Sequence, residues 1–150
     1  MNYSIVFTES YQERAEIHDN LYSYNLSKTG AERQEVQAKD EPQSGALVVK
    51  DENGKSYGGV VFHFLSDPRQ VYVDYFYLAD AIRGQGWGIK VFAALEEFAR
   101  KENAVNITLT TNTFQAPGFY QKAGFVQVDA KAAPQPKVPE NIHYTFRKEM

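Results

Sequence analysis

Three glycines at alternate positions, Gly84, Gly86 and Gly88, follow Arg83 in the stretch AIRGQGWGIKVF. An amphipathic pattern begins directly after them and predicts that the turn leads into a helix. The first turn of a helix has unpaired N–H groups and carries about half a positive charge, and glycines let another molecule approach the backbone. The residues therefore indicate an anion site, usually one for phosphate, at this turn.

Two common phosphate-binding loops do not match the stretch. The dinucleotide-binding fingerprint needs a third glycine at the position of Ile89, and the P-loop needs a Gly-Lys-Ser/Thr sequence that is absent here. The pattern that does match is Arg/Gln-x-x-Gly-x-Gly/Ala, met by Arg83, Gly86 and Gly88. Because so short a pattern arises by chance in on the order of one chain in ten of this length, a turn without a ligand is the alternative.

The elements that must position this turn alternate between strand and helix patterns. Apolar spacing predicts helices over 11–27, from the glycine turn to about residue 99, and over 117–124. The buried face of the helix after the glycine turn would carry Ile89, Phe92, Leu95, Phe98 and Ala99. Strands are predicted over 3–8, 45–51, 57–65, 69–78, 105–111, 125–130 and 142–150, with a hairpin at Asn53-Gly54 and a loop or ragged second helix over 29–44. This order predicts a single α+β or mixed α/β domain over residues 1–150.

Composition excludes several classes of protein. The 150 residues contain no cysteine, so a disulfide framework, a thiolate metal site and a cysteine nucleophile are excluded. A net charge of −3 argues against a broad nucleic-acid surface. No signal-peptide pattern and no long apolar window occurs, so we expect a cytoplasmic chain with no membrane and no nucleic-acid partner.

A second block, FQAPGFYQKAGF, follows the glycine turn at a distance. Together with FYLADAIRGQGWGIKVFAALEEFA it resembles the two conserved blocks of the GNAT superfamily of acetyl-CoA-dependent N-acetyltransferases, most closely its small bacterial members. The resemblance implies a mostly antiparallel, twisted sheet of about six or seven strands, splayed in the middle and flanked by about four helices. It also implies acetyl-CoA as cosubstrate and no metal.

The resemblance assigns roles to individual residues. The amides from Arg83 to Gly88 would hold the pyrophosphate, the Leu78 amide would lie nearest the thioester carbonyl, and Tyr120 would face the sulfur as general acid. The alternative for Tyr120 is aromatic packing, and Trp87 could point either into the core or outward. The implied cofactor-binding residues are Phe76, Tyr77, Leu78, Arg83, Gly84, Gln85, Gly86, Trp87, Gly88, Asn112, Ala116, Phe119 and Tyr120.

The sequence leaves the identity of the general base open. Asp74 is the first candidate, and strand alternation places it on the same face as Phe76 and Leu78 unless a bulge resets the register. Asp74 could equally be a rim residue without a role. The other candidates are Tyr75, Tyr77, His63, His143 and water relayed to solvent.

The sequence says least about the acceptor. In this fold it usually enters beside the first helical region, where Tyr22, Tyr24 and Asn25 are candidates, with helix packing as the alternative. We expect transfer of an acetyl group to a primary amine of a small molecule by direct attack in a ternary complex. The alternative functions are a non-catalytic CoA or acyl-CoA sensor and a protein or peptide acetyltransferase. The sequence is also compatible with a homodimer.

Two positions depart from the family pattern. Asp80 stands where many relatives have proline, and Thr113 stands where many have asparagine, with Asn112 one step early. The first departure bears on the shape of the glycine turn. The second puts an asparagine contact to the coenzyme or substrate in doubt.

Overall fold

The computed structural model describes residues 2–31, 38–115 and 117–150, and its centre is one seven-stranded sheet. The strand order is β1-β2-β3-β4-β5-β7-β6, and all neighbouring pairs are antiparallel except β4 and β5. This confirms the predicted, mostly antiparallel sheet. The strands are β1 (Tyr3–Thr8), β2 (Ser44–Asp51), β3 (Ser56–Leu65), β4 (Gln70–Leu78), β5 (Asn106–Asn112), β6 (Val126–Ala132) and β7 (Ile142–Glu149).

The described residues form three α-helices, fewer than the four or so expected: α1 (Tyr11–Thr29), α2 (Trp87–Lys101) and α3 (Gly118–Lys122). Two further segments, η1 (Asp80–Ile82) and η2 (Thr113–Gln115), have only three residues each and form single 3-10 turns. Of the segment predicted as a loop or second helix, residues 38–43 are not helical and 32–37 lie outside the described residues. None of the described helices is long and apolar enough to cross a membrane.

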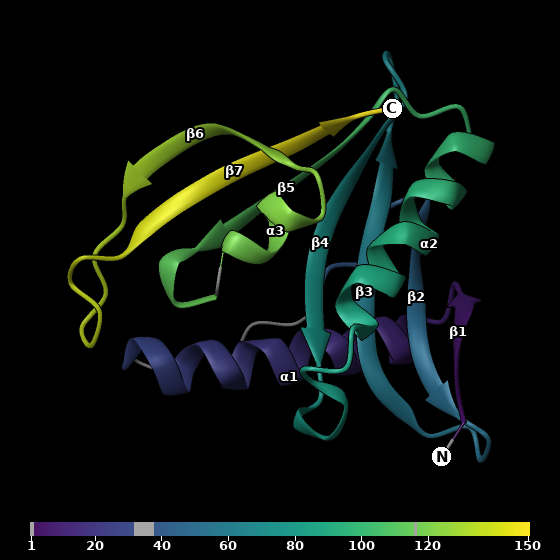
Figure 1. The fold of residues 1–150 in the computed structure, drawn as a ribbon, viewed down its shortest axis with the longest axis horizontal. Helices are drawn as coiled ribbons and strands as arrows, with labels where there is room; N and C mark the ends of the chain where they lie inside the picture. The colour runs from purple at the N-terminus through teal and green to yellow at the C-terminus, as the bar shows by residue number, and fades with distance from the viewer. Residues whose placement is uncertain (1, 32–37, 116) are drawn as a thin grey trace.

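The two long helices cover opposite faces of the sheet (Figure 1). On one face Ile17 of α1 packs against Ala46 and Val48 of β2. On the other face α2 packs against Leu47 and Val49, the alternate residues of the same strand. The sheet therefore has an α1 face and an α2 face.

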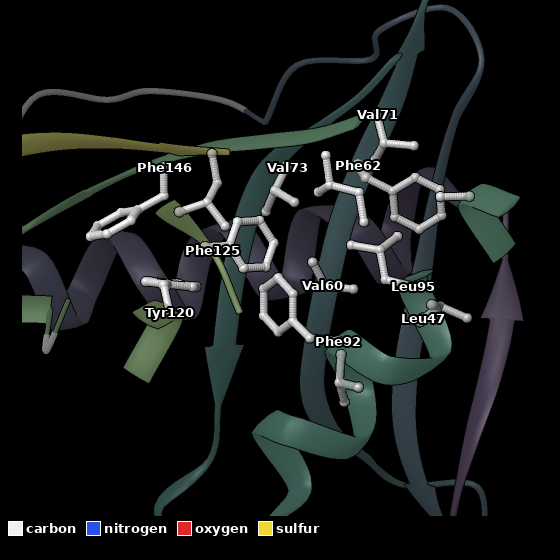
Figure 2. Packing of buried hydrophobic residues seen from close by; sticks show 14 of the residues in the cluster. Leu47, Val60, Phe62, Val71, Val73, Phe92, Leu95, Tyr120, Phe125 and Phe146 are labelled. Atoms are coloured by element: carbon white, nitrogen blue, oxygen red, sulfur yellow. The ribbon is translucent and has the colours of Figure 1, made fainter. Parts of the chain in front are cut away.

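The core on the α2 face is built largely from aromatic rings and β-branched side chains. Figure 2 shows Tyr120 of α3 beside Phe146 and Phe125, with Phe92 of α2 close by. The buried residues of α2 are Val91, Phe92, Leu95 and Ala99. The prediction that Ile89 lies on the buried face is wrong, because this residue is in the first turn of the helix and is 45% exposed.

The strands β4 and β5 stay together over only two residue pairs, Val71 with Ile107 and Tyr72 with Thr108. Beyond these pairs they diverge, and β5, β7 and β6 fan away from the rest of the sheet (Figure 1). The splayed sheet implied by the family resemblance is therefore present, and its opening begins next to Val73.

A β-bulge in β4 lies at the point where the strands separate. Val61 of β3 pairs with Tyr75 while the next residue, Phe62, pairs with Val73, so Asp74 is an extra residue without a partner in the ladder. The bulge that was named above as the exception to strand alternation is therefore present, and Asp74 does not share a face with Phe76 and Leu78. Asp74 and Tyr75 both lie on the α1 face, whereas the side chains of residues 73, 76 and 78 pack on the α2 face.

A glycine holds β3 close to the end of β4. Gly58 has φ +99°, and a Cβ atom at this position would collide with the carbonyl oxygen of Tyr77. Because that oxygen is backbone, it cannot move aside as a side chain could. Gly54, in the hairpin before it, also has a positive φ of +81°, but its added Cβ would meet open space.

We expect Gly58→Ala to lower the free energy of unfolding by about 2–5 kcal/mol, the sum of left-handed backbone strain and forced overpacking. The matched variant Gly54→Ala carries only the backbone strain and should lose about 1–2 kcal/mol. Urea unfolding followed by circular dichroism measures both. Equal losses in the two variants would contradict the close approach at Gly58.

Candidate functional site

The gap between β4 and β5 opens into a cleft of about 570 Å³, within the usual size range of small-molecule sites. Its lining comes from both faces of the sheet. From the α2 face come Phe76, Leu78, Phe119 and Tyr120, and from the α1 face come Leu21, Tyr24, Asp74, Tyr75 and Tyr77. The cleft therefore connects the two faces at the place where the sheet is split.

The glycine turn lies at the mouth of this cleft on the α2 side. Gly84 and Gly86 have φ values of +74° and +83°, and an added Cβ at either would meet nothing within 4 Å. Gly88 differs, because its added Cβ would lie 2.9 Å from the ring of Phe119. Two of the three glycines therefore shape an open, approachable turn, and the third makes room for the second sequence block.

Side chains of the glycine turn form hydrogen bonds to backbone carbonyl groups of the turn and of the strand before it. Arg83 donates from Nε to the carbonyl oxygen of Leu78 at 2.7 Å and pairs through Nη1 with Asp80 at 2.7 Å. Gln85 donates to the carbonyl oxygen of Ala81 at 3.0 Å. Asp80, the residue that replaces a common proline, is therefore part of the clamp on the turn.

The first turn of α2 leaves backbone N–H groups available. Gly86 is the N-cap and provides no side-chain acceptor, and the Lys90 amide is the donor to the Gly86 carbonyl. The amides of the residues between them have no acceptor within the helix. An anion at the mouth of the cleft would meet these N–H groups and the positive end of the helix dipole.

The backbone of Leu78 faces the gap. The neighbouring Ala79 amide donates to Tyr57 of β3 at 2.9 Å, and consecutive residues of an antiparallel ladder direct their polar groups to opposite sides. The Leu78 N–H therefore points away from β3, on the same side as its carbonyl, which accepts from Arg83. By the same alternation the amide of Phe76 also faces the gap.

Tyr120 lies in the cleft wall and is 7% exposed. Its ring meets those of Phe92, Phe119 and Phe125 at centroid distances of 5.6, 5.2 and 6.1 Å. Burial raises the pKa of Tyr120 well above its ordinary value, so the phenol stays protonated at neutral pH. The residue therefore both packs in the core and presents a hydroxyl donor at the cleft.

Asp74 and His63 form a largely buried pair on the α1 face. Oδ2 of Asp74 lies 2.8 Å from Nδ1 of His63, and the two side chains are 12% and 13% exposed. Burial raises the pKa of Asp74, and the bond to His63 works in the opposite direction. Asp74 lines the cleft whereas His63 stands behind it, so of the proposed bases the structure brings Asp74, Tyr75 and Tyr77 to the cleft.

Asn112 does not line the cleft, because its side chain is used inside the protein. Its Nδ2 donates to Oε1 of Gln115, and its Oδ1 accepts from Asn141 and lies 3.3 Å from Nδ1 of His143. Gln115 lines the cleft instead, and its Nε2 donates to Asn25 of α1 at 3.0 Å. Sequence reasoning missed Gln115, although its place in the block FQAPGFYQKAGF was a signal.

The remaining candidates divide between the cleft and its surroundings. Trp87 is half-buried, packs against the core and meets Tyr3 edge-on at 5.6 Å, so it points inward. Tyr24 lines the cleft, whereas Tyr22 stacks on His18 outside it. Ala116 lies outside the described residues.

Within the described chain no group of three or more His, Asp and Glu side chains could hold a metal ion.

Comparisons with known proteins agree with this geometry. The sequence model of the acetyltransferase (GNAT) family matches residues 7–125. Acetyltransferase Atu2258 of Agrobacterium fabrum is 25% identical over 128 residues, covering 85% of this chain and 86% of that protein. Blasticidin-S acetyltransferase of Streptomyces morookaense is 36% identical over 75 residues, covering 49% of this chain and 54% of that protein, so the match spans about half of each.

Solved structures share the fold. An acetyltransferase of Bacillus cereus has a TM-score of 0.64 at 25% identity, with 94% of each chain covered. A GCN5-related N-acetyltransferase of Kribbella flavida has a TM-score of 0.75 at 17% identity, with 99% of this chain and 98% of that chain covered. An acetyltransferase of Bacillus anthracis, solved with acetyl coenzyme A, has a TM-score of 0.61 at 18% identity over 74% of this chain and 65% of that chain.

Gln115 provides a test of the polar network beside the cleft. Its Oε1 accepts the backbone N–H of Asn112 at 2.9 Å, so Gln115→Ala leaves a partly buried donor unpaired. We expect the free energy of unfolding to fall by about 1–3 kcal/mol in a urea titration. Gln121→Ala, at an exposed position of α3, should change it by less than about 0.5 kcal/mol. A loss no larger than that of the control would contradict the network.

Proposed function

Because the chain belongs to the acetyltransferase (GNAT) family, we propose that it transfers the acetyl group of acetyl-CoA to a primary amine of a small acceptor. The observation that carries this proposal is the cleft through the split sheet, with the glycine turn at one mouth and Asp74 on the opposite face. Such a passage lets a donor and an acceptor meet from opposite sides, so both are bound when the amine attacks. The name of the blasticidin-S acetyltransferase supports a small molecule as acceptor.

The donor site is formed by backbone groups. Gly84 and Gly86 leave the turn open, and the free N–H groups at the start of α2 suit a pyrophosphate. Beyond the turn, the outward amides of Phe76 and Leu78 offer hydrogen bonds to an extended amide-containing arm, as one strand offers them to another. Acetyl-CoA supplies an acetyl thioester at the end of such an arm.

Asp74 prepares the acceptor. A free alkylamine has a pKa near 10.4 and is protonated at neutral pH, so it must lose a proton before it can attack. The Asp74 carboxylate attracts the ammonium group and takes that proton, and its raised pKa makes it a stronger base than an exposed aspartate. His63 holds the carboxylate in place from behind.

Two donors complete the transfer. The amine nitrogen forms a bond to the acetyl carbon while the Leu78 N–H stabilises the charge that develops on the carbonyl oxygen. The carbon–sulfur bond then breaks, and the departing thiolate receives a proton from Tyr120. The amide nitrogen gives up its extra proton, which restores the phenol through water. The products are the N-acetylated amine, free CoA thiol and the one proton first removed by Asp74.

Replacing Tyr120 with phenylalanine tests the proton donor. Tyr120→Phe keeps the buried ring, so acetyl-CoA should bind with nearly unchanged affinity in calorimetry. Turnover, followed by release of free thiol, should fall about 100-fold because the leaving thiolate lacks its donor.

Tyr144→Phe is the matched control, since Tyr144 packs beside the core on β7 without lining the cleft. It should leave turnover unchanged. Wild-type turnover in Tyr120→Phe would remove Tyr120 from the mechanism.

The dependence of rate on pH tests Asp74. The carboxyl group must be ionised to accept a proton, so kcat/KM should decrease as pH falls through the raised pKa of Asp74. Asp74→Asn should lower kcat/KM at neutral pH about 100-fold and remove this acid limb. Asp129→Asn, at an exposed position of β6, should keep the wild-type profile. An unchanged profile in Asp74→Asn would assign the base to water.

A further inference from the structure

Few charged side chains line the acceptor side of the cleft. Among the described residues that line the cleft, the charged side chains are Asp74 and Arg83. The guanidinium of Arg83 is already held by Leu78 and Asp80. Within the described lining, an acceptor that enters from the α1 face therefore meets one carboxylate, while Glu41 and Lys39 lie outside the lining but close enough to act on Asp74 electrostatically.

The rest of that side is a wall of tyrosine rings. Tyr24 from α1 and Tyr75 and Tyr77 from β4 line it, with Leu21 beside them. Hydrogen bonds hold two of these rings in place. The Tyr75 hydroxyl accepts from the Lys39 amide at 3.4 Å, and the Tyr24 hydroxyl donates to the Phe114 carbonyl at 3.5 Å.

Two of these rings are already engaged with a cation. The guanidinium carbon of Arg83 lies 5.2 Å from the ring centroids of both Tyr24 and Tyr77. These faces are therefore less available to a second cation through a cation–π contact. Tyr75 is packed edge-on by His18, at 4.9 Å between centroids, on the helix side. What this wall offers to a ligand is mainly flat apolar surface.

We propose that the acceptor is an amine with one positive charge on a flat, largely apolar body, as in an arylalkylamine. The inference rests on the acetyl transfer proposed above. Asp74 takes the ammonium group, and the tyrosine wall covers an aromatic ring one or two carbons away. A polyamine or aminoglycoside would have to bury further ammonium groups against tyrosine rings, and no second carboxylate lines the cleft among the described residues, so this burial costs free energy.

A thiol-release assay with matched amines tests the inference. The probes are 2-phenylethylamine, with one charge and a ring, 1,6-diaminohexane, with two charges on a chain, and an aminoglycoside. The kcat/KM for 2-phenylethylamine should exceed that for either polycation at least about tenfold, since only the arylalkylamine buries an apolar ring.

A variant of Tyr75 tests whether the tyrosine wall causes the preference for 2-phenylethylamine. Tyr75→Ala should lower kcat/KM for 2-phenylethylamine about tenfold, mainly through KM, and lower the value for 1,6-diaminohexane by a clearly smaller factor. Tyr11→Ala is the control, because Tyr11 lies at the start of α1 outside the cleft, and it should keep the wild-type ratio of the two values.

The outcomes separate the two levels of the proposal. A preference for the diamine or the aminoglycoside would overturn the inference and leave acetyl transfer standing. An equal loss for both amines in Tyr75→Ala would overturn the role of the tyrosine wall. Binding of acetyl-CoA with no thiol release for any amine would overturn the proposed turnover, and this inference with it, in favour of a sensor.

Discussion

The separation of β4 from β5 after two residue pairs is the constraint on which the rest of the site depends. A sheet that splits gives up ladder hydrogen bonds, and the exposed edge must find other partners in water or a ligand. Here the edge is the floor of a cleft of about 570 Å³, and strand alternation directs the Leu78 and Phe76 amides toward it. A site that binds an extended arm thus arises directly from the interrupted pairing.

The bulge at Asp74 adapts β4 to this split. It bends the strand at the point of separation and places two consecutive side chains, Asp74 and Tyr75, on the α1 face. Phe76 and Leu78 are thereby directed to the α2 face, where they meet the aromatic core. One extra residue therefore gives the cleft two chemically different sides, an acidic and tyrosine-lined one toward α1 and an apolar one toward α2.

Much of the fold follows from local sequence, whereas the cleft follows in part from contacts between distant segments. The strands, α1, α2 and the glycine turn were predictable because each depends on periodicity or turn residues within about 20 positions. The face of Asp74 was not, because the bulge is set by pairing with β3. The role of Gln115 was also hidden, because its partners Asn25 and Asn112 come from other elements.

The two sequence blocks, AIRGQGWGIKVF and FQAPGFYQKAGF, are more informative together than apart, and the packing of Gly88 gives a physical reason. A side chain at this position would reach the ring of Phe119, and that ring stacks on Phe76 at 5.7 Å between centroids. The first block therefore leaves a space that the second block fills, and Phe76 on β4 completes the contact. Because Tyr120 is the residue next to Phe119, the same packing that seats α3 against the glycine turn also fixes the phenol at the cleft. A glycine at position 88 thus serves the placement of Tyr120, whereas Gly84 and Gly86 serve the turn itself.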